Sequence, residues 1–506
     1  LAATRVDVNG LIEKGRENIA TYSEDATNGV YTKSNISVTA NNDASPIGTA
    51  TADTLTATAN GATLQGVVTA VNGRVYTMSV YIKRRTGTGQ VALRGINNLT
   101  TNITITNAWQ RYEVFMVSNS TNGRYGVYLA TSGDEVDVWG FQLEESLVAT
   151  DYIETGASTA QAGILEDLPR LDYSGGASCP SLLLEPQRTN RLANSENGYG
   201  WTTSNVSVLP FDGGINGKYF QLTSAGSASR FNVIQNNWVN LAAATYTASV
   251  FAKKGTADEI ILTTRANFAS QSAYSTFNLT SGTVANNGVT GSIEPYSDGW
   301  YRCSITFANP GSYTDFASFA YGFNFNASST DTLFVTAPQS EIGSYPTSYI
   351  PTYGSAVTRS AENNVLGTPI SLDSDFCLFW EGAVFEDDIM LYGSGTNAWY
   401  MNYTTSTGRI ILDESSGRKV QAYLGSGTAT GVRTKIMIRR QGGVHNVFAN
   451  GAKLTNNTSV NSTTTLSLSS MFWAFSSAFY KGLEVNQSLV FETALTDSEC
   501  IALTTI

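Results

Sequence analysis

The feature that most constrains this chain is an internal duplication within its first 355 residues. The pattern Tyr-Thr-x-Ser-Val-Tyr-x-Lys at 76–83 returns at 246–253 with Phe for the second Tyr. A period this long is that of a whole domain rather than of a solenoid repeat. We therefore predict two copies of one module, at 1–155 and 170–355, with a linker at 156–169. Further matches keep the same order, 165 to 197 positions apart: Arg5 and Arg170, Glu13 and Glu185, Arg16 and Arg188, Ser23-Glu24 and Ser195-Glu196, Trp109 and Trp300, Gln142 and Gln339, Glu144 and Glu341, Tyr152 and Tyr349.

Each copy has the pattern of short β-strands. In the stretch 76–82, Val80 and Ile82 fall on one face, while Thr77, Ser79 and Tyr81 fall on the other. Turn-forming runs such as 119–123 and 286–288 separate the strands, and no stretch keeps a helical period. Many short strands at this spacing predict an antiparallel β-sandwich of the jelly-roll type in each copy.

The remaining segment, 356–506, does not match the repeat but is also strand-like. Asn450-Gly451 follows an apolar strand and predicts a two-residue hairpin turn. Thr496 and Glu499 have the spacing of a capping box, which predicts one short helix near the end. The predicted fold is thus all-β, with tandem β-sandwiches followed by a third, concanavalin-A-like β-sandwich.

Composition excludes several classes of function. Charged residues are only 14% of the chain, and the net charge is −11, which argues against nucleic acid and against anionic membrane surfaces as partners. No apolar run reaches the length of a membrane span, so we expect no membrane insertion. The cysteines are far apart and lack metal-ligand spacing, so we expect no metal site and no cofactor. Calcium could bind a loop such as Asp331 or 373–375, but no calcium-binding motif supports this.

The residues of two regions resemble bacteriophage virion proteins. The stretch 170–175 and the following Cys-Pro-Ser-Leu-Leu-Leu-Glu-Pro-Gln-Arg-Thr-Asn at 179–190 resemble a segment of tail-fibre and appendage proteins. That segment is usually followed by a jelly roll similar to carbohydrate-binding modules. The closing stretch 488–499, with 447–451 before it, is similar to concanavalin-A-like (laminin-G-type) lectin domains, although Asn450 stands where such hairpins often have Asp.

This resemblance implies a virion structural protein, part of a tail fibre, tail appendage or head fibre, that binds host cell-surface glycans. It implies further that the chain is assembled in the host cytoplasm into the virion, beside other virion proteins and as a homotrimer. One alternative is an architectural capsid or tail decoration protein that has no receptor. A second alternative is a secreted bacterial protein that binds or cleaves glycans.

We expect no enzymatic activity. The chain has one histidine, His445, in a predicted strand, and no Gly-x-Ser-x-Gly motif frames a serine. A glycosidase would need only two carboxylates, so acidic pairs remain as candidates. These are Asp387 and Asp388, Asp413 and Glu414, and Glu144 and Glu145, each of which has a simpler interpretation as a turn or a solvated strand edge.

Aromatic residues near Gly- and Asn-rich loops are the candidate sugar-stacking residues. The residues shared between the copies are instead expected to support the fold: we predict that the arginines pair with the glutamates in an Arg–Glu clasp, and that the tryptophans belong to the core. The sugar-stacking candidates are Tyr199, Trp201, Trp238, Trp399 and Tyr400, and the structural residues are Arg16, Arg188, Trp109, Trp300, Glu144 and Glu341, with Arg111 and Arg302 as further partners for the glutamates.

Overall fold

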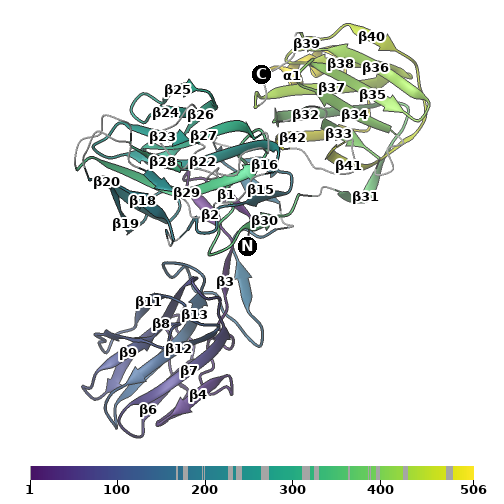
Figure 1. The fold of residues 1–506 in the computed structure, drawn as a ribbon. Coiled ribbons are helices and arrows are strands. Elements are labelled where there is room, and N and C mark those ends of the chain that lie inside the picture. Colours follow the sequence, from purple (N-terminus) through teal and green to yellow (C-terminus); the bar gives the residue numbers. More distant parts are fainter. Residues whose placement is uncertain are drawn as a thin grey trace.

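Strands make up nearly all the regular structure of the computed structural model (Figure 1). The structure describes residues 2–166, 169–174, 180–196, 198, 200–225, 232–234, 242–263, 273–309, 320–323, 330–362, 365–385, 387, 389–394, 399–425, 431–474 and 482–506. Within these residues, all pairings between the named strands are antiparallel, and the strands form three β-sandwiches that are joined by short two-stranded sheets. The predicted all-β fold is confirmed.

The first sandwich packs two five-stranded sheets against each other. Its strands are β4 (Tyr31–Ser34), β5 (Ile36–Asp43), β6 (Ala52–Ala57), β7 (Ala62–Thr69), β8 (Val75–Thr86), β9 (Val91–Arg94), β10 (Thr100–Ile103), β11 (Gln110–Val117), β12 (Asn122–Leu129) and β13 (Glu135–Glu144). The sheet orders are β10-β9-β12-β7-β4 and β11-β8-β13-β6-β5. Met78, Val80 and Ile82 of β8 point into the core between them, as the alternation in the sequence predicts.

The second sandwich repeats this topology with one added edge strand in each sheet. Its elements are β18 (Thr202–Ser204), β19 (Val206–Asp212), β20 (Lys218–Ser224), β21 (Asn232–Ile234), β22 (Ala244–Lys254), β23 (Glu259–Thr263), β24 (Tyr274–Asn278), β25 (Thr283–Asn287), β26 (Thr290–Pro295), the 3-10 turn Ser297–Gly299, β27 (Trp300–Asn309), β28 (Ala320–Phe323) and β29 (Thr332–Ile342). The orders are β18-β21-β28-β23-β24-β25 and β19-β20-β29-β22-β27-β26. The added strands, β25 and β26, account for part of the greater length of this copy.

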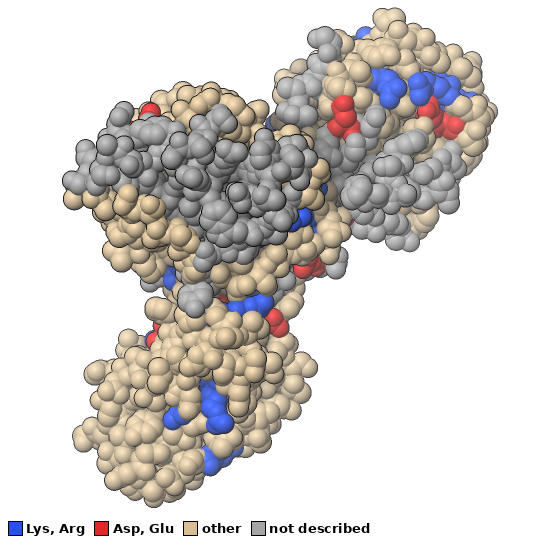
Figure 2. All heavy atoms as spheres, viewed as in Figure 1, with Lys and Arg blue, Asp and Glu red and all other residues tan. Residues whose placement is uncertain are grey.

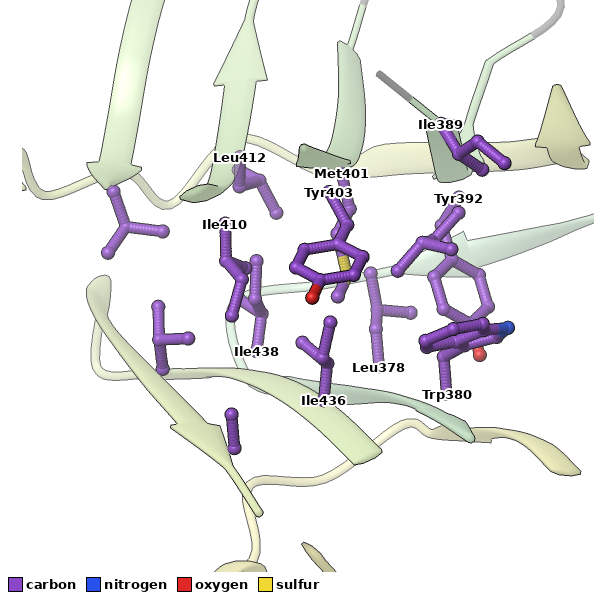
Figure 3. Packing of buried hydrophobic residues seen from close by; sticks show 14 of the residues in the cluster. Leu378, Trp380, Ile389, Tyr392, Met401, Tyr403, Ile410, Leu412, Ile436 and Ile438 are labelled. Carbon is purple, nitrogen blue, oxygen red and sulfur yellow. The ribbon is translucent and has the colours of Figure 1, made fainter. Parts of the chain in front are cut away.

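The third sandwich has two seven-stranded sheets. Its elements are β31 (Val365–Leu372), β32 (Phe376–Val384), β33 (Ile389–Gly393), β34 (Trp399–Thr404), β35 (Arg409–Glu414), β36 (Gly417–Tyr423), β37 (Thr434–Gln441), β38 (Val444–Ala449), β39 (Ala452–Lys453), β40 (Asn456–Ser459), β41 (Leu466–Ala474), β42 (Leu483–Phe491) and α1 (Asp497–Thr504), together with β15 (Arg170–Asp172) and β16 (Ser181–Leu184). The orders are β15-β16-β42-β32-β37-β38-β39 and β31-β41-β33-β34-β35-β36-β40. Figure 3 shows the core between them, where Leu378 and Trp380 face Tyr403, and Ile436 and Ile438 lie beside them.

Two local signals in the third sandwich are confirmed. Asn450 and Gly451 both have positive φ, 45° and 80°, as a tight hairpin turn between β38 and β39 requires. Thr496 caps α1, and its side chain and that of Glu499 form the reciprocal hydrogen bonds of a capping box. Among the described residues, no helix has the length and apolarity that crossing a bilayer would need.

The segment in front of each copy forms a hairpin that packs on a later sandwich. These hairpins are β1 (Thr4–Val6) with β2 (Ile12–Lys14), and β15 with β16. Each carries the same ion pair, Arg5 with Glu13 (2.8 Å) and Arg170 with Glu185 (2.9 Å). The first hairpin packs on the second sandwich, and β16 of the second hairpin extends the third sandwich through β42. The packing units are therefore shifted along the chain from the predicted boundaries at 1 and 170.

After the last strand of each repeated sandwich, the chain returns to pair with the strand that leads into that sandwich. β14 (Ala160–Ala162) pairs with β3 (Arg16–Asn18), and β30 (Val357–Arg359) pairs with β17 (Arg188–Asn190). The predicted linker 156–169 thus contains a short strand that returns to the start of its own copy. Figure 1 shows β1, β2, β15 and β30 gathered where the second sandwich meets its neighbours.

The predicted Arg–Glu clasp needs correction. Arg188 lies 3.8 Å from Glu341, at the limit of an ion pair, whereas Arg16 pairs with Asp151 (3.4 Å) and not with Glu144. Glu341 instead accepts the backbone N–H (2.8 Å) and hydroxyl (2.6 Å) of Thr347. The turn after β29 supplies these donors, so the carboxylate has hydrogen-bond partners besides the distant Arg188.

A threonine links the repeated arginine and glutamate in both copies. Arg302 donates to the carbonyl oxygen of Thr347 (2.6 Å), whose N–H and hydroxyl bind Glu341. In the first copy, Arg111 donates to the carbonyl oxygen of Thr150, whose N–H and hydroxyl bind Glu144. The shared unit is thus an Arg–Thr–Glu bridge that fastens the turn after the last strand to the sheet.

Glu341→Leu is expected to lower the free energy of unfolding by about 1–3 kcal/mol, because it leaves buried donors of Thr347 without an acceptor. Ligand binding should be unchanged. The exposed Glu154→Leu is the matched control, with an expected change within about 0.5 kcal/mol. Thermal melting and ligand binding of both variants would be compared. Loss of binding with unchanged melting would contradict a purely structural role of Glu341.

Candidate ligand-binding surface

The structure describes three of the five predicted sugar-stacking residues, Trp201, Trp399 and Tyr400. Tyr199 and Trp238 lie outside the described residues. Trp201 packs its ring against Phe220, with centroids 4.8 Å apart, and its indole N–H donates to the carbonyl oxygen of Asn194 (2.8 Å). Trp201 therefore closes the edge of the second core and offers no open face with a free donor.

Trp399 and Tyr400 lie on opposite faces of β34, because successive side chains of a strand alternate. Trp399 is 3% exposed, belongs to the third core, and donates its indole N–H to the carbonyl oxygen of Ser467 (2.9 Å). Tyr400 points to the outer face of the sheet, where its hydroxyl donates to Asp413 (2.8 Å). Of the five aromatic candidates, only Tyr400 is thus placed among surface polar groups of the described structure.

Tyr400 begins a hydrogen-bonded row that crosses β34, β35 and β36. Asp413 binds Arg418 in a two-point ion pair, with Nε–Oδ1 of 2.9 Å and Nη2–Oδ2 of 3.1 Å. Arg418 also donates to the side-chain oxygen of Gln421 (2.6 Å), and the amide of Gln421 donates to the hydroxyl of Tyr423 (2.9 Å). We call these five residues the Tyr400–Tyr423 row.

Strand register explains why these residues meet. Asp413 lies directly opposite Tyr400 on one side and Arg418 on the other. A register shift between Leu412 and Asp413 in the pairing with β36 leaves Asp413 and Arg418 on the outer face together. The sequence prediction missed Arg418, Gln421 and Tyr423. One signal was available: a short turn joins Glu414 to Gly417, and the residues one step further from the turn on each strand are Asp413 and Arg418, which face each other.

The pKa values of Tyr400 and Arg418 are raised, so both side chains stay protonated near neutral pH. Burial, followed by the hydrogen bond and charge of Asp413, raises the pKa of Tyr400 to about 12. The hydrogen bond to Asp413 raises the pKa of Arg418. The row therefore presents a fixed set of donors and acceptors between two aromatic rings. Such a set can meet the hydroxyls and apolar C–H faces of a polyhydroxylated ligand at once.

Charge is sparse elsewhere on the surface. In Figure 2 most of the visible face is uncharged, and the third sandwich displays Lys or Arg atoms close to Asp or Glu atoms. Because only 14% of the residues are charged, a surface row that contains an ion pair differs from its surroundings.

A cavity with a volume of about 850 Å³ lies between the first and second sandwiches. Several charged groups on its walls already have partners across or along the junction. Lys14 pairs with Glu196 (2.8 Å), and Arg74 pairs with Glu145 (2.8 Å). The first of these ion pairs joins the β1–β2 hairpin to the second copy, whereas the second lies within the first sandwich. Both occupy charged groups on the cavity wall.

A smaller cavity of about 100 Å³ lies where the second hairpin meets the second and third sandwiches. Burial and nearby carboxylates, led by Asp172, raise the pKa of Glu484 to about 7, and burial raises the pKa of Glu294. This volume suits a few water molecules rather than a sugar ring. Among the described side chains, no group of three or more His, Cys, Asp or Glu could hold a metal ion.

Comparison with known proteins gives only distant likenesses. No family model matches the chain, and no curated protein matches it. The CBM40 of Ruminococcus gnavus IT-sialidase, solved bound to alpha2,3 sialyllactose, is 14% identical, with 27% of this chain and 84% of that chain covered and a TM-score of 0.22. The tandem CBM22 domains of Paenibacillus barcinonensis Xyn10C are 13% identical, with 68% and 100% covered and a TM-score of 0.22. Domains LG4-5 of mouse laminin alpha1 chain are 11% identical, with 60% and 95% covered and a TM-score of 0.19.

These TM-scores are too low to assign the chain to a family or to transfer a ligand. The three-sandwich architecture accordingly follows from the strands, sheets and cores of this chain itself. The described residues thus form an all-β chain, and its last sandwich carries the partly exposed Tyr400–Tyr423 row on the outer face of a sheet.

Proposed function

We propose that this chain is a non-enzymatic, glycan-binding structural protein of a bacteriophage virion, part of a tail fibre, tail appendage or head fibre. The observation that carries the glycan-binding part is the Tyr400–Tyr423 row. It places two tyrosine rings beside a carboxylate, a guanidinium and an amide on the outer, partly exposed face of a sheet. Contacts of this kind are weak singly, and several copies on one particle would supply avidity.

The setting on a virion rests on the resemblance of 170–175 and 179–190 to phage appendage proteins. Two architectural features are consistent with it. Three sandwiches follow one another in an open arrangement (Figure 1), and hairpins from the chain fasten successive sandwiches together. A series of fastened domains suits a fibre or appendage that must carry a binding surface away from a particle.

The surroundings of the acidic residues and of the histidine support a non-enzymatic role. His445 is fully buried, and burial together with Arg440 lowers its pKa to about 4, so it is neutral and inaccessible near pH 7. Asp413 lies on the surface with Arg418, whereas the adjacent Glu414 is buried and accepts a hydrogen bond from Ser462 (2.8 Å). These two carboxylates therefore face opposite sides of a sheet and do not flank a common site.

The described carboxylates of the other acidic pairs bind neighbouring groups of the fold. Glu144 binds Thr150, and Glu145 binds Arg74 and Tyr76. Asp387 accepts hydrogen bonds from the turn that precedes β35, and Asp388 lies outside the described residues. Each described carboxylate thus has a structural partner, which favours binding over hydrolysis.

The test is glycan-array binding by the full-length chain and by Tyr400→Ala and Tyr423→Ala variants. We expect each variant to lose about tenfold or more in affinity, because a central aromatic contact is often worth 2 kcal/mol or more. Tyr128→Ala, at a half-buried tyrosine of the first sandwich, is the matched control and should bind like the unaltered chain. Binding that survives both row variants would remove the row from the proposal. Absence of any glycan binding would favour the architectural decoration protein instead.

A further inference from the structure

The contact between the first hairpin and the second sandwich is closely fitted. The N–H of Ile12 donates to the carbonyl oxygen of Ile215 (2.7 Å), and Ser297 donates to the carbonyl oxygen of Gly10 (2.9 Å). Lys14 reaches Glu196 with an Nζ–Oε2 distance of 2.8 Å. The hairpin thus uses backbone groups, one aliphatic side chain and one cation to hold its position.

Ile12 of this hairpin covers an aromatic patch on the outer face of the sheet. It forms one hydrophobic cluster with Ile215, Phe251, Trp300, Ala337 and Tyr349. Phe251 and Trp300 are each only 2% exposed as a result. Because these residues alternate with the core-facing positions of β22 and β27, an uncovered sheet would leave them open to solvent.

The first sandwich has a related patch, in which the buried Trp139 packs against Tyr81 (ring centroids 5.6 Å apart) and Tyr152 (4.5 Å), whereas the second copy has Thr336 at the position of Trp139. Tyr81, Trp109 and Tyr152 stand where the second copy has Phe251, Trp300 and Tyr349, in the repeat alignment of the sequence. The backbone agrees, since Gly140 and Ala337 both have positive φ, 69° and 51°, at bulges in β13 and β29. Glu24 occupies the position of Glu196, the residue that binds Lys14.

In the first sandwich this patch remains partly open. Tyr81 and Trp109 are half-buried, in contrast to their nearly fully buried counterparts. Ile47 is 68% exposed and lies in the loop that corresponds to that of Ile215, where Gly48 and Gly217 both have positive φ.

We propose that this face, formed by Ile47, Tyr81, Trp109, Tyr152 and Glu24, is a docking site for a β-hairpin supplied by another polypeptide. The hairpin is of the β1–β2 type, with an aliphatic residue at the position of Ile12 and a cation two residues later, which would meet Glu24. The internal duplication specifies this occupant, because the equivalent face of the second sandwich holds such a hairpin. Docking would join sandwiches of different chains in the way that sandwiches of this chain are joined.

The test uses a fluorescent peptide with the sequence of residues 2–16, titrated into the full-length chain and followed by fluorescence anisotropy. The second sandwich already holds its own hairpin, so saturable binding reports on the first. We expect a dissociation constant roughly between micromolar and millimolar, since a short hairpin must become ordered as it binds. A peptide with Ile12→Asp should bind at least about tenfold more weakly.

Variants of the chain locate the site. Ile47→Asp should weaken peptide binding about tenfold or more. Because Ile47 is exposed, this substitution should leave the folded state intact. Val67→Asp is the matched control, at a 50% exposed apolar residue on the other sheet of the same sandwich, and should bind as the unaltered chain does. If the peptide binds Ile47→Asp as tightly as it binds the unaltered chain, the proposal is overturned. That result would follow if the peptide displaced the chain's own hairpin from the second sandwich. The proposal is also overturned if the peptide does not bind while the chain self-associates, or binds a glycan, in a way that Ile47→Asp abolishes. The face would then belong to a second copy of the chain or to a sugar.

Discussion

Arg359→Met is expected to lower the free energy of unfolding by about 3–5 kcal/mol, because it leaves a buried carboxylate with too little positive charge. The Arg359 side chain is fully buried, and its Nη1 lies 2.8 Å from Oε2 of Glu185. It also donates to the hydroxyl of Ser348 (2.8 Å) and to the carbonyl oxygen of Pro186 (3.1 Å). Glu185 is shared with Arg170 (2.9 Å), so the cluster needs both arginines to be satisfied.

The same variant should make the protein more sensitive to acid. Burial opposes ionisation of Glu185, but Arg359 and Arg170 together lower its pKa to about 2. A carboxylate with a folded pKa below its unfolded value stabilises the fold above the unfolded pKa, and this contribution is lost as pH falls through the folded pKa. Without Arg359 the folded pKa rises, so acid unfolding should begin at a higher pH.

Chemical denaturation at neutral pH and melting across a pH series would measure both effects. Lys254→Met is the matched control, because Lys254 forms an ion pair with Asp258 (2.8 Å) in which both side chains are about half exposed. Exposed pairs contribute about 0–1 kcal/mol, so this variant should change stability little. If Arg359→Met lowered the free energy of unfolding no more than Lys254→Met, the buried cluster of Arg170, Glu185 and Arg359 would not contribute much to stability.

Patterns within short stretches predicted much of the fold. The repeated blocks predicted two related modules, and the sandwiches share sheet orders apart from the added strands β25 and β26. The capping box of α1 and the turn at Asn450 were predictable because each depends on residues that are neighbours in sequence. Such local signals need no knowledge of the rest of the chain.

Long-range packing was not predictable in the same way. The repeated Trp109 and Trp300 have the same sequence context, yet only Trp300 is fully buried, because Ile12 covers it from a distant part of the chain. Trp399 and Tyr400 are adjacent, and only the position of the opposing sheet decides which of them enters the core. The candidate site was therefore found only in part: Tyr400 was predicted, but the rest of its row depends on the register of three strands.

Asn190→Leu should be among the most destabilising single changes in the second sandwich. Its side-chain amide donates to the carbonyl oxygens of Ile350 (2.8 Å) and Pro338 (3.4 Å). Its side-chain oxygen accepts the N–H groups of Leu192 (3.1 Å) and Ser340 (3.2 Å). Leucine has a similar size but can make none of these bonds, so buried backbone groups lose their partner at about 1–3 kcal/mol each.

Asn18 makes the equivalent bonds in the first sandwich. It donates to the carbonyl oxygens of Phe141 (3.0 Å) and Ile153 (2.8 Å), and accepts from the N–H groups of Ala20 and Leu143, both at 3.0 Å. The two asparagines thus tie the entering strand to the last strand and to the chain that leaves the sandwich. This shared task is one physical reason why the two copies have kept the same residue.

The two asparagine variants should act on different parts of the chain. Each sandwich has its own hydrophobic core, so calorimetry of Asn18→Leu and Asn190→Leu should show a different transition lowered in each. The exposed Asn102→Leu is the control and should leave every transition in place. Glycan binding by the third sandwich should survive both variants below their transitions. If either variant abolished glycan binding while its sandwich remained folded, residues shared by the copies would have to serve recognition, and the search for a ligand would move from the Tyr400–Tyr423 row to the repeat.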